Sequence, residues 1–192
     1  MSKGIWFSVL FMLFVSGFAH AGDSAEQVFE KVKAAAKRID YAQLVVTDKI
    51  DRNTIAFAVS RHAKECIVYV HVEVVEDSYP EELAAIFGHE FAHCLLRHHR
   101  LFNPEHPGFQ RQAWAAEYAA DKLGLKLAKR AGYDAQALME GFLILLPEDL
   151  LHPPGPARVA ALQGRRRVFP SENLSYNELV ERAFNSSQTI QK

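Results

Sequence analysis

The chain has 192 residues and a formal net charge of −1, with 22 lysines and arginines against 23 aspartates and glutamates. Hydrophobic residues make up 49% of it and charged residues 23%, which is the composition of an ordinary globular domain. With balanced charge, the chain has no excess of basic residues that would bind nucleic acid or an anionic membrane surface. Composition therefore argues against a polyanionic partner and for one folded domain.

The N-terminal segment has the pattern of a secretory signal peptide. Lys3 precedes an apolar run over residues 5–18, and the small residues Ala19 and Ala21 follow it. The run is shorter than the roughly 17 to 25 residues that a membrane-spanning helix needs. We predict cleavage after Ala21, which makes 22–192 a single exported domain, periplasmic or secreted, with no integral membrane segment. The alternative is an uncleaved N-terminal anchor.

The first part of the predicted domain combines one helix with a small sheet. Helical spacing covers 25–38, and segments rich in valine and isoleucine predict strands at 43–48, 54–60 and 65–75. In the last strand the alternation places four valines on one face, which we expect to face the core. These are Val68, Val70, Val72 and Val74.

Helices dominate the remainder. Ser78, with Glu81 three residues later, predicts a capping box for a helix over 80–100. Further helices are predicted at 110–130, closed by Gly132, and from a cap at Asp134 to Pro147. A rigid stretch at 152–156 precedes a short helix at 157–162 and an amphipathic piece near 174–184. Strands first and helices after indicate an α+β domain.

The sequence His89-Glu90-Phe91-Ala92-His93 is an HExxH motif inside a predicted helix. Residues four apart lie one turn above each other, so both imidazoles can bind one zinc ion at about 2.0 to 2.1 Å. Glu90 is rotated by about 100° from His89, where it reaches a water on the metal but does not share the ion easily. We therefore expect a zinc hydrolase in which Glu90 is the general base.

A third ligand must come from elsewhere, and His99 is the first candidate because it lies ten residues after His89. That spacing works only where a glycine turns the chain, and Leu96 stands at that position. An unbroken helix would carry His99 about 9 Å further along the axis. For His98 and His99 we expect a polar helix end that suits the helix dipole.

The better candidate is Glu117 on the next predicted helix, where small residues permit close helix packing. Asp121 shares its face, so one carboxylate can bind zinc while the other accepts the outer ring N–H of a ligand histidine and fixes its tautomer. A glutamate and an aspartate at this spacing are by themselves more often a solvated helix face. The upstream HExxH motif favours the metal site.

Four motifs in order resemble the gluzincin metallopeptidases of the HtpX-like and CAAX prenyl endopeptidase group, over about 53–162. They are a strand at 53–59, the metal helix at 82–98, the segment at 117–121 with its exit at 131–134, and His152-Pro153 with Arg158. The resemblance implies a zincin-like α+β domain, with a small mixed sheet packed on helices. It also implies one zinc per chain held by His89, His93 and Glu117, with Glu90 catalytic and Asp121 supporting.

The same resemblance implies that His152 and Arg158 belong to the catalytic site. His152 could stabilise the oxyanion of the tetrahedral intermediate or occupy the open metal position. The alternative is a histidine in a proline-rich surface turn. Arg158 could pair with a carboxylate of the site or orient His152, or it could be an exposed helix arginine.

By resemblance the protein is an endopeptidase of the soluble periplasmic type, and its partners are misfolded or unassembled proteins of the cell envelope. The segment 67–75 could bind such a chain as an added strand. Two other functions remain open. One is a zinc-bound chaperone or assembly factor in which the segment around His152 closes the metal position, and the other is a zinc hydrolase of small amides. The oligomeric state is also open.

The chain has two cysteines, Cys66 and Cys94. Export would permit a disulfide between them. The alternative is two buried thiols, one opening a strand and one on the metal helix. Either state fits if these two elements pack side by side.

Overall fold

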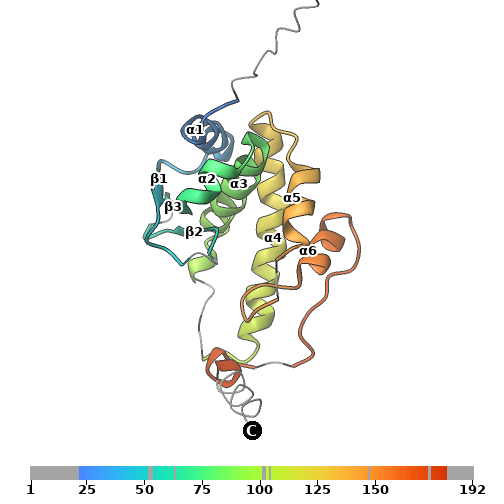
Figure 1. Ribbon diagram of the computed structural model, residues 1–192. Helices are drawn as coiled ribbons and strands as arrows, with labels where there is room; N and C mark the ends of the chain where they lie inside the picture. Colours follow the sequence, from blue (N-terminus) through green and yellow to red (C-terminus); the bar gives the residue numbers. More distant parts are fainter. Residues whose placement is uncertain are drawn as a thin grey trace, which may run out of the picture.

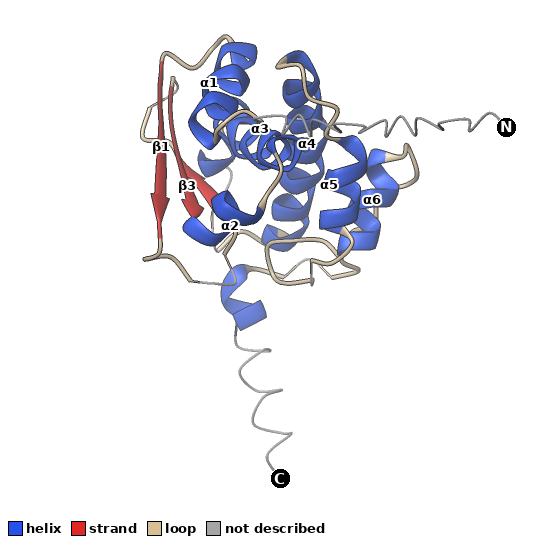
Figure 2. Cartoon of the chain, turned by 45° about the horizontal axis from the view of Figure 1, so that its top comes forward, coloured by secondary structure: helices blue, strands red, loops and turns tan. Residues whose placement is uncertain are grey.

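The computed structural model describes residues 22–51, 54–62, 64–100, 103, 105–146, 148–172 and 174–180. The predicted signal peptide lies outside them. A small sheet forms one side of the molecule, α3 (Pro80–Leu96) and α4 (Phe109–Arg130) form its middle, and α5 (Gln136–Leu143) and α6 (Gly155–Leu162) form the other side (Figures 1 and 2). None of the helices in the described part of the chain is long and apolar enough to cross a membrane.

The sheet has three strands in the order β1-β3-β2, namely β1 (Tyr41–Thr47), β3 (Glu65–His71) and β2 (Ala56–Val59). β1 runs parallel to β3 and β2 runs antiparallel to it. The predicted α+β class with a small mixed sheet is therefore confirmed. Because β3 is the central strand, the prediction that 67–75 takes up a substrate strand is wrong. The outer edge on the side of the cleft described below belongs to β2.

The third predicted strand is shorter than expected. β3 ends at His71 and the chain continues as α2 (Val72–Asp77), whose first turn is capped by His71 Nδ1, which accepts a hydrogen bond from the Glu73 N–H at 3.3 Å. Val68 and Val70 are fully buried, as predicted, whereas Val72 and Val74 lie on the helix. Alternating valines match a strand, but the cap and the acidic first turn favour a helix at this point.

Both ends of α3 differ from the prediction. The capping box is built on Tyr79, whose N–H donates to Glu82 Oε2 at 2.9 Å, while Ser78 ends α2. At the other end, Arg97 adopts a left-handed conformation with φ 57°, and a 3₁₀ turn η1 (His98–Arg100) follows. The helix thus ends four residues earlier than the predicted boundary, and the chain turns back.

The other helices agree with prediction to within a few residues. α1 (Ala25–Ala36) begins at a capping box on Ser24, α4 closes at Gly132 with φ 98°, and residues 176–180 are helical up to the last described position. The predicted cap at Asp134 is wrong, because α5 begins after Ala135 without a side-chain cap.

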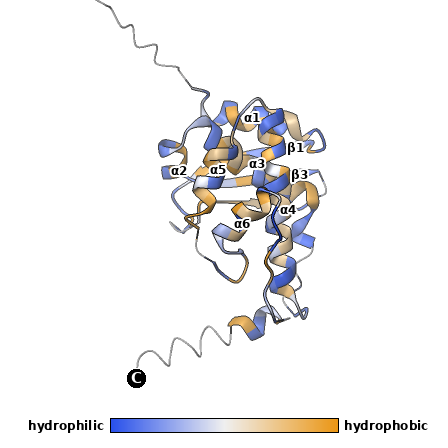
Figure 3. Ribbon diagram, turned by 90° about the vertical axis from the view of Figure 1, so that its right-hand side faces the viewer, coloured by the Kyte–Doolittle hydropathy of each residue, from blue (hydrophilic) through white to orange (hydrophobic). Residues whose placement is uncertain are grey.

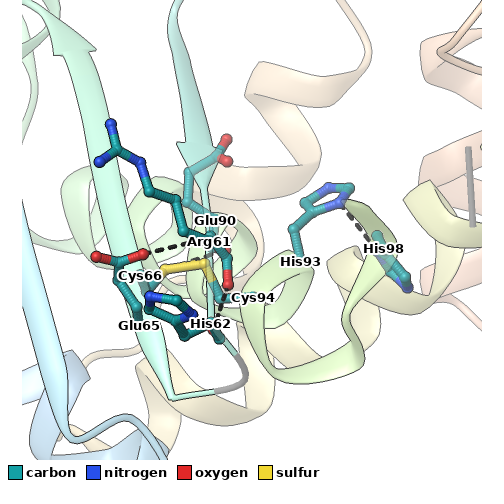
Figure 4. The surroundings of a disulfide bond; sticks show 9 residues. Arg61, His62, Glu65, Cys66, Glu90, His93, Cys94 and His98 are labelled. Atoms are coloured by element: carbon teal, nitrogen blue, oxygen red, sulfur yellow. Dashed lines mark hydrogen bonds between the residues drawn. A yellow bond between two sulfur atoms is a disulfide. The ribbon is translucent and has the colours of Figure 1, made fainter. Parts of the chain in front are cut away.

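The core lies between α1, the sheet and α3. Phe87 and Phe91 of α3 are fully buried and both pack against Phe29 of α1. On the sheet side, Cys66 of β3 and Cys94 of α3 form a disulfide with their Cα atoms 5.7 Å apart (Figure 4). Of the two states left open for the cysteines, the structure has the disulfide. α3, which carries the HExxH motif, is therefore held by packing and by a covalent bond.

Candidate active site

Two glycines bring α3 and α4 together beside the HExxH motif. A Cβ atom on Gly88 would lie 2.5 Å from the carbonyl oxygen of Gly124, and one on Gly124 would lie 2.7 Å from the backbone nitrogen of His89. The two helices therefore meet backbone to backbone. Glu117 precedes Gly124 by about two helical turns, which places it opposite the histidines. Sequence reasoning attributed this close packing to small residues on the helix of Glu117 in general and missed the glycine pair.

The structure brings together the three side chains predicted to bind metal. His89 Nε2 lies 3.0 Å from His93 Nε2 and 3.4 Å from Glu117 Oε2, and His93 Nε2 lies 3.2 Å from Glu117 Oε1. Their ligand atoms all lie within 4.8 Å of one another. His99, which was rejected as a ligand, is outside this cluster.

The distances between these ligand atoms fit an ion with tetrahedral coordination. Ligands bound at about 2.0 to 2.1 Å in a tetrahedron are separated by about 3.3 Å, close to the three distances observed. Glu117 is 5% exposed, and its Oε2 accepts no hydrogen bond within the described residues, although the Arg158 guanidinium is 3.2 Å away. A buried carboxylate whose two oxygens each face an imidazole nitrogen suits a cation. The residues present therefore fit a metal ion.

The electrostatics of the cluster also favour a cation. Burial alone would lower the pKa of His89, but the adjacent carboxylates of Asp121 and Glu117 raise that pKa to about 10. Burial would raise the pKa of Glu117, but the adjacent His89 and His93 hold it well below its ordinary value. The site thus holds ionised carboxylates against imidazoles, and a metal that binds His89 must displace a proton from it.

An ion-pair network supports His89 from behind. Asp121 Oδ1 lies 3.0 Å from His89 Nδ1, and Arg158 donates to both carboxylate oxygens of Asp121, from Nε at 2.9 Å and from Nη2 at 2.6 Å. Asp121 is 1% exposed and Arg158 3%. Burial would raise the pKa of Asp121, but Arg158 and His89 lower it, so Asp121 is a carboxylate. The alternative that Arg158 is an exposed helix arginine is therefore wrong. Of its two predicted partners, a carboxylate of the site or His152, the structure shows the carboxylates.

His93 has a partner that sequence reasoning missed. The left-handed turn at Arg97 brings His98 back along α3, so that its Nδ1 lies 2.9 Å from Nδ1 of His93 (Figure 4). The expectation of a polar helix end is wrong for His98, which is 4% exposed, whereas His99 is exposed. Burial and the neighbouring His93 lower the pKa of His98 to about 4, so its ring is neutral.

The metal cluster lies in a cleft of about 620 Å³ whose lining includes His89, Glu90 and Glu117. One wall is apolar and comes from α5 and the loop after it, which carry hydrophobic colours in Figure 3. Its side chains are Leu138, Met139, Phe142, Leu143 and Leu146. The other side carries the acidic residues Asp51, Glu73, Asp77 and Glu82. Among the described residues that line the cleft, Arg158 is the only lysine or arginine, and its charge is matched by Asp121 and Glu117.

His152 lines the same cleft and pairs with Asp149, which sequence reasoning did not single out. The distance between His152 Nδ1 and Asp149 Oδ2 is 2.7 Å, and Asp149 Oδ1 also accepts the backbone N–H groups of Leu151 and His152. Burial would lower the pKa of His152, but Asp149 raises it above its ordinary value. The aspartate three residues before a histidine in a proline-rich turn was the available signal.

Comparison with known proteins agrees with this site. The family model described as Peptidase family M48 matches residues 22–103 and 108–166, which is most of the chain. No curated protein and no solved structure matches it. M48 peptidases are metal-dependent, and the cluster of His89, His93 and Glu117 could hold the metal ion that they require. The chain therefore belongs to peptidase family M48, the metallopeptidase family with which the spacing of its HExxH motif, its fold and its His-His-Glu cluster all agree.

Proposed function

We propose that the protein is a zinc-dependent endopeptidase that cleaves unfolded polypeptide chains. The observation that carries the proposal is the convergence of His89, His93 and Glu117 beside a cleft that His89, Glu90 and Glu117 line. Zinc held there would lower the pKa of a water molecule and polarise the scissile carbonyl. Two imidazoles and one carboxylate leave a fourth position open to substrate, which is typical of catalytic rather than structural zinc sites.

Glu90 is the proposed general base. It follows His89 directly on α3 and is 8% exposed on the lining of the cleft. From there its carboxylate takes a proton from the attacking water and delivers it to the leaving amine. Asp121 and Arg158 act as positioning residues, because they hold His89 through its outer nitrogen and do not reach the substrate.

His152 is the proposed oxyanion-stabilising residue. Its bond to Asp149 fixes the ring through Nδ1 and favours the protonated form, which leaves Nε2–H as a donor. A donor of this kind strengthens its hydrogen bond as negative charge develops on the carbonyl oxygen. Within the described residues nothing favours the chaperone or assembly-factor alternative, in which His152 would close the metal position.

The two sides of the cleft support a substrate preference. An extended chain pairing with the outer edge of β2 would run past Thr54, Ile55 and Ala56, which line the cleft. Its side chains would then meet apolar residues of α5 on one side and the carboxylates of α2 on the other. We infer that segments with both apolar and basic residues bind best. Misfolded or unassembled proteins of the bacterial cell envelope, met after export to the periplasm, are the proposed source of such segments.

Replacing Glu90 by glutamine tests the mechanism. Glu90→Gln keeps the size of the side chain but cannot accept the proton, so we expect turnover of an unfolded protein such as reduced casein to fall by at least about 100-fold. Zinc content should be unchanged. A variant that digests casein as fast as wild type would rule out Glu90 as the base.

A further inference from the structure

We propose that His98 is a positioning residue for the metal ligand His93: its ring accepts the Nδ1–H of His93 and so fixes Nε2 of His93 as the metal-binding atom. The inference deepens the proposed function and rests on the metal site proposed there. His98 lies outside the HExxH motif and is not one of the three proposed metal ligands.

The contacts of His93 divide cleanly between its two ring nitrogens. Nε2 faces the ligand cluster, 3.0 Å from His89 Nε2 and 3.2 Å from Glu117 Oε1. Nδ1 faces only His98 among the described residues, at 2.9 Å from its Nδ1. The two rings are nearly perpendicular, with an interplanar angle of 80° and centroids 4.8 Å apart. The contact is therefore a hydrogen bond between ring nitrogens and not a stack.

Only one arrangement of protons satisfies both nitrogens of His93 when a metal is bound. A neutral imidazole carries one N–H, so a metal on Nε2 leaves the proton on Nδ1. His98 Nδ1 must then accept that proton, and the single proton of His98 must sit on its own Nε2. The reverse arrangement would leave His93 Nδ1 as an acceptor and place its proton on Nε2, where it blocks the metal.

The two ligand histidines are thus held by different means. His89 has a carboxylate behind it, at 3.0 Å from Asp121 Oδ1, and His93 has a neutral imidazole. Partners that occupy the outer nitrogen of a metal-binding histidine fix its tautomer and orientation. Losing such a partner typically lowers metal affinity by about 10- to 100-fold. We expect an effect of that size for His98.

The backbone is built to deliver His98 to this position. On a continuous helix, a residue five positions after His93 would lie about 140° away around the axis. The left-handed Arg97, with φ 57° and ψ 40°, ends α3, and its N–H bonds back to the carbonyl of Cys94 at 3.1 Å. His98 then folds inward and is buried, while His99 next to it is exposed.

Zinc competition against a chelator on the purified protein tests the inference. His98→Leu removes the acceptor and leaves a buried N–H of His93 without a partner, so we expect zinc affinity to fall about 10- to 100-fold. His98→Gln supplies a side-chain oxygen and should recover most of that loss. His99→Leu is the matched control and should bind zinc like wild type. Equal zinc affinity of His98→Leu and wild type would overturn the inference while leaving the metal site intact.

The wild-type protein offers a second test that needs no variant. In the zinc-loaded protein, long-range ¹H–¹⁵N correlation of the imidazoles should place the proton of His93 on Nδ1 and that of His98 on Nε2. A proton on Nδ1 of His98 would overturn the inference even if His98→Leu failed to fold. A wild-type protein that binds no zinc would instead overturn the proposed function, and this inference with it.

Discussion

Gly88 and Gly124 touch backbone to backbone, and this contact sets the distance between the helix of the two histidines and the helix of Glu117. The carbonyl oxygen of Gly124 lies 2.5 Å from where a Cβ atom on Gly88 would be. No side chain larger than hydrogen fits at either position without moving the helices apart. The geometry of the metal cluster therefore depends on two residues that bind nothing.

Gly124→Ala should destabilise the protein and weaken its metal site. The added methyl group would lie 2.7 Å from the backbone nitrogen of His89, and overpacking of this kind costs roughly 1 to 3 kcal/mol. Chemical unfolding and zinc competition measure the two effects. Gly141→Ala is the control, because nothing lies within 4 Å of its Cβ position and alanine favours the helix. Equal behaviour of both variants would contradict the close contact.

Arg158→Met should be strongly destabilising. The guanidinium is buried between Asp121 and Glu117, so its removal leaves buried carboxylates uncompensated, at a cost of roughly 3 to 5 kcal/mol. The midpoint of chemical unfolding in the metal-free protein reports this loss. Arg166→Met, at an exposed position, serves as the control and should change the midpoint little. A metal-free Arg158→Met protein as stable as wild type would show that the network contributes nothing.

Asp149→Asn should shift the alkaline limb of the pH profile. Asp149 raises the pKa of His152, and His152 acts as a donor only while protonated. Without the carboxylate the pKa of His152 falls, so the limb in kcat/KM should move to lower pH. The stabilisation that the folded protein gains from protonated His152 is present at low pH and is lost as pH rises through its folded pKa. An unchanged pH dependence of kcat/KM in Asp149→Asn would mean that catalysis does not need the protonated form of His152.

The acidic side of the cleft predicts a charge preference in substrates. Glu73 and Asp77 lie four residues apart on α2 and both line the cleft. In the double variant Glu73→Gln, Asp77→Asn, cleavage of lysine-containing peptides should slow several-fold, and the effect should shrink at high salt. Apolar neutral peptides should be cleaved as before. The matched variant Glu76→Gln changes α2 at a position outside the cleft lining, and a loss of the same size there would contradict the assignment.

Local patterns in the sequence predicted most of the fold. The helices at 109–130 and 155–162 follow from spacing and from breakers such as Gly132, and the buried Val68 and Val70 follow from alternation. The helix at 72–77 could not be predicted from such patterns, because a run of valines and acidic residues matches a strand and a helix equally. What separates the two is the His71 side chain, which caps the helix in the folded chain.

The residues of the candidate site also divide into those that local sequence patterns predicted and those that they did not. HExxH fixes the relative placement of His89, Glu90 and His93 within one helix, so sequence could locate them. Glu117 and Asp121 needed a contact between helices, which the sequence indicated only through the small residues of their helix and through the order of the motifs. His98 and Asp149 depend on turns, one at a left-handed arginine and one in a proline-rich loop, and no periodic pattern reports a turn of either kind.

The metal content of the purified protein and two variants tests the central claim most directly. We predict one zinc per chain in wild type, loss of that zinc in Glu117→Ala, and full retention in His99→Ala. Glu117 contributes an oxygen 3.2 Å from the His93 nitrogen, whereas His99 lies outside the cluster. Retention of wild-type zinc affinity in Glu117→Ala would show that the carboxylate on α4 is not a ligand, and the His-His-Glu site would be wrong.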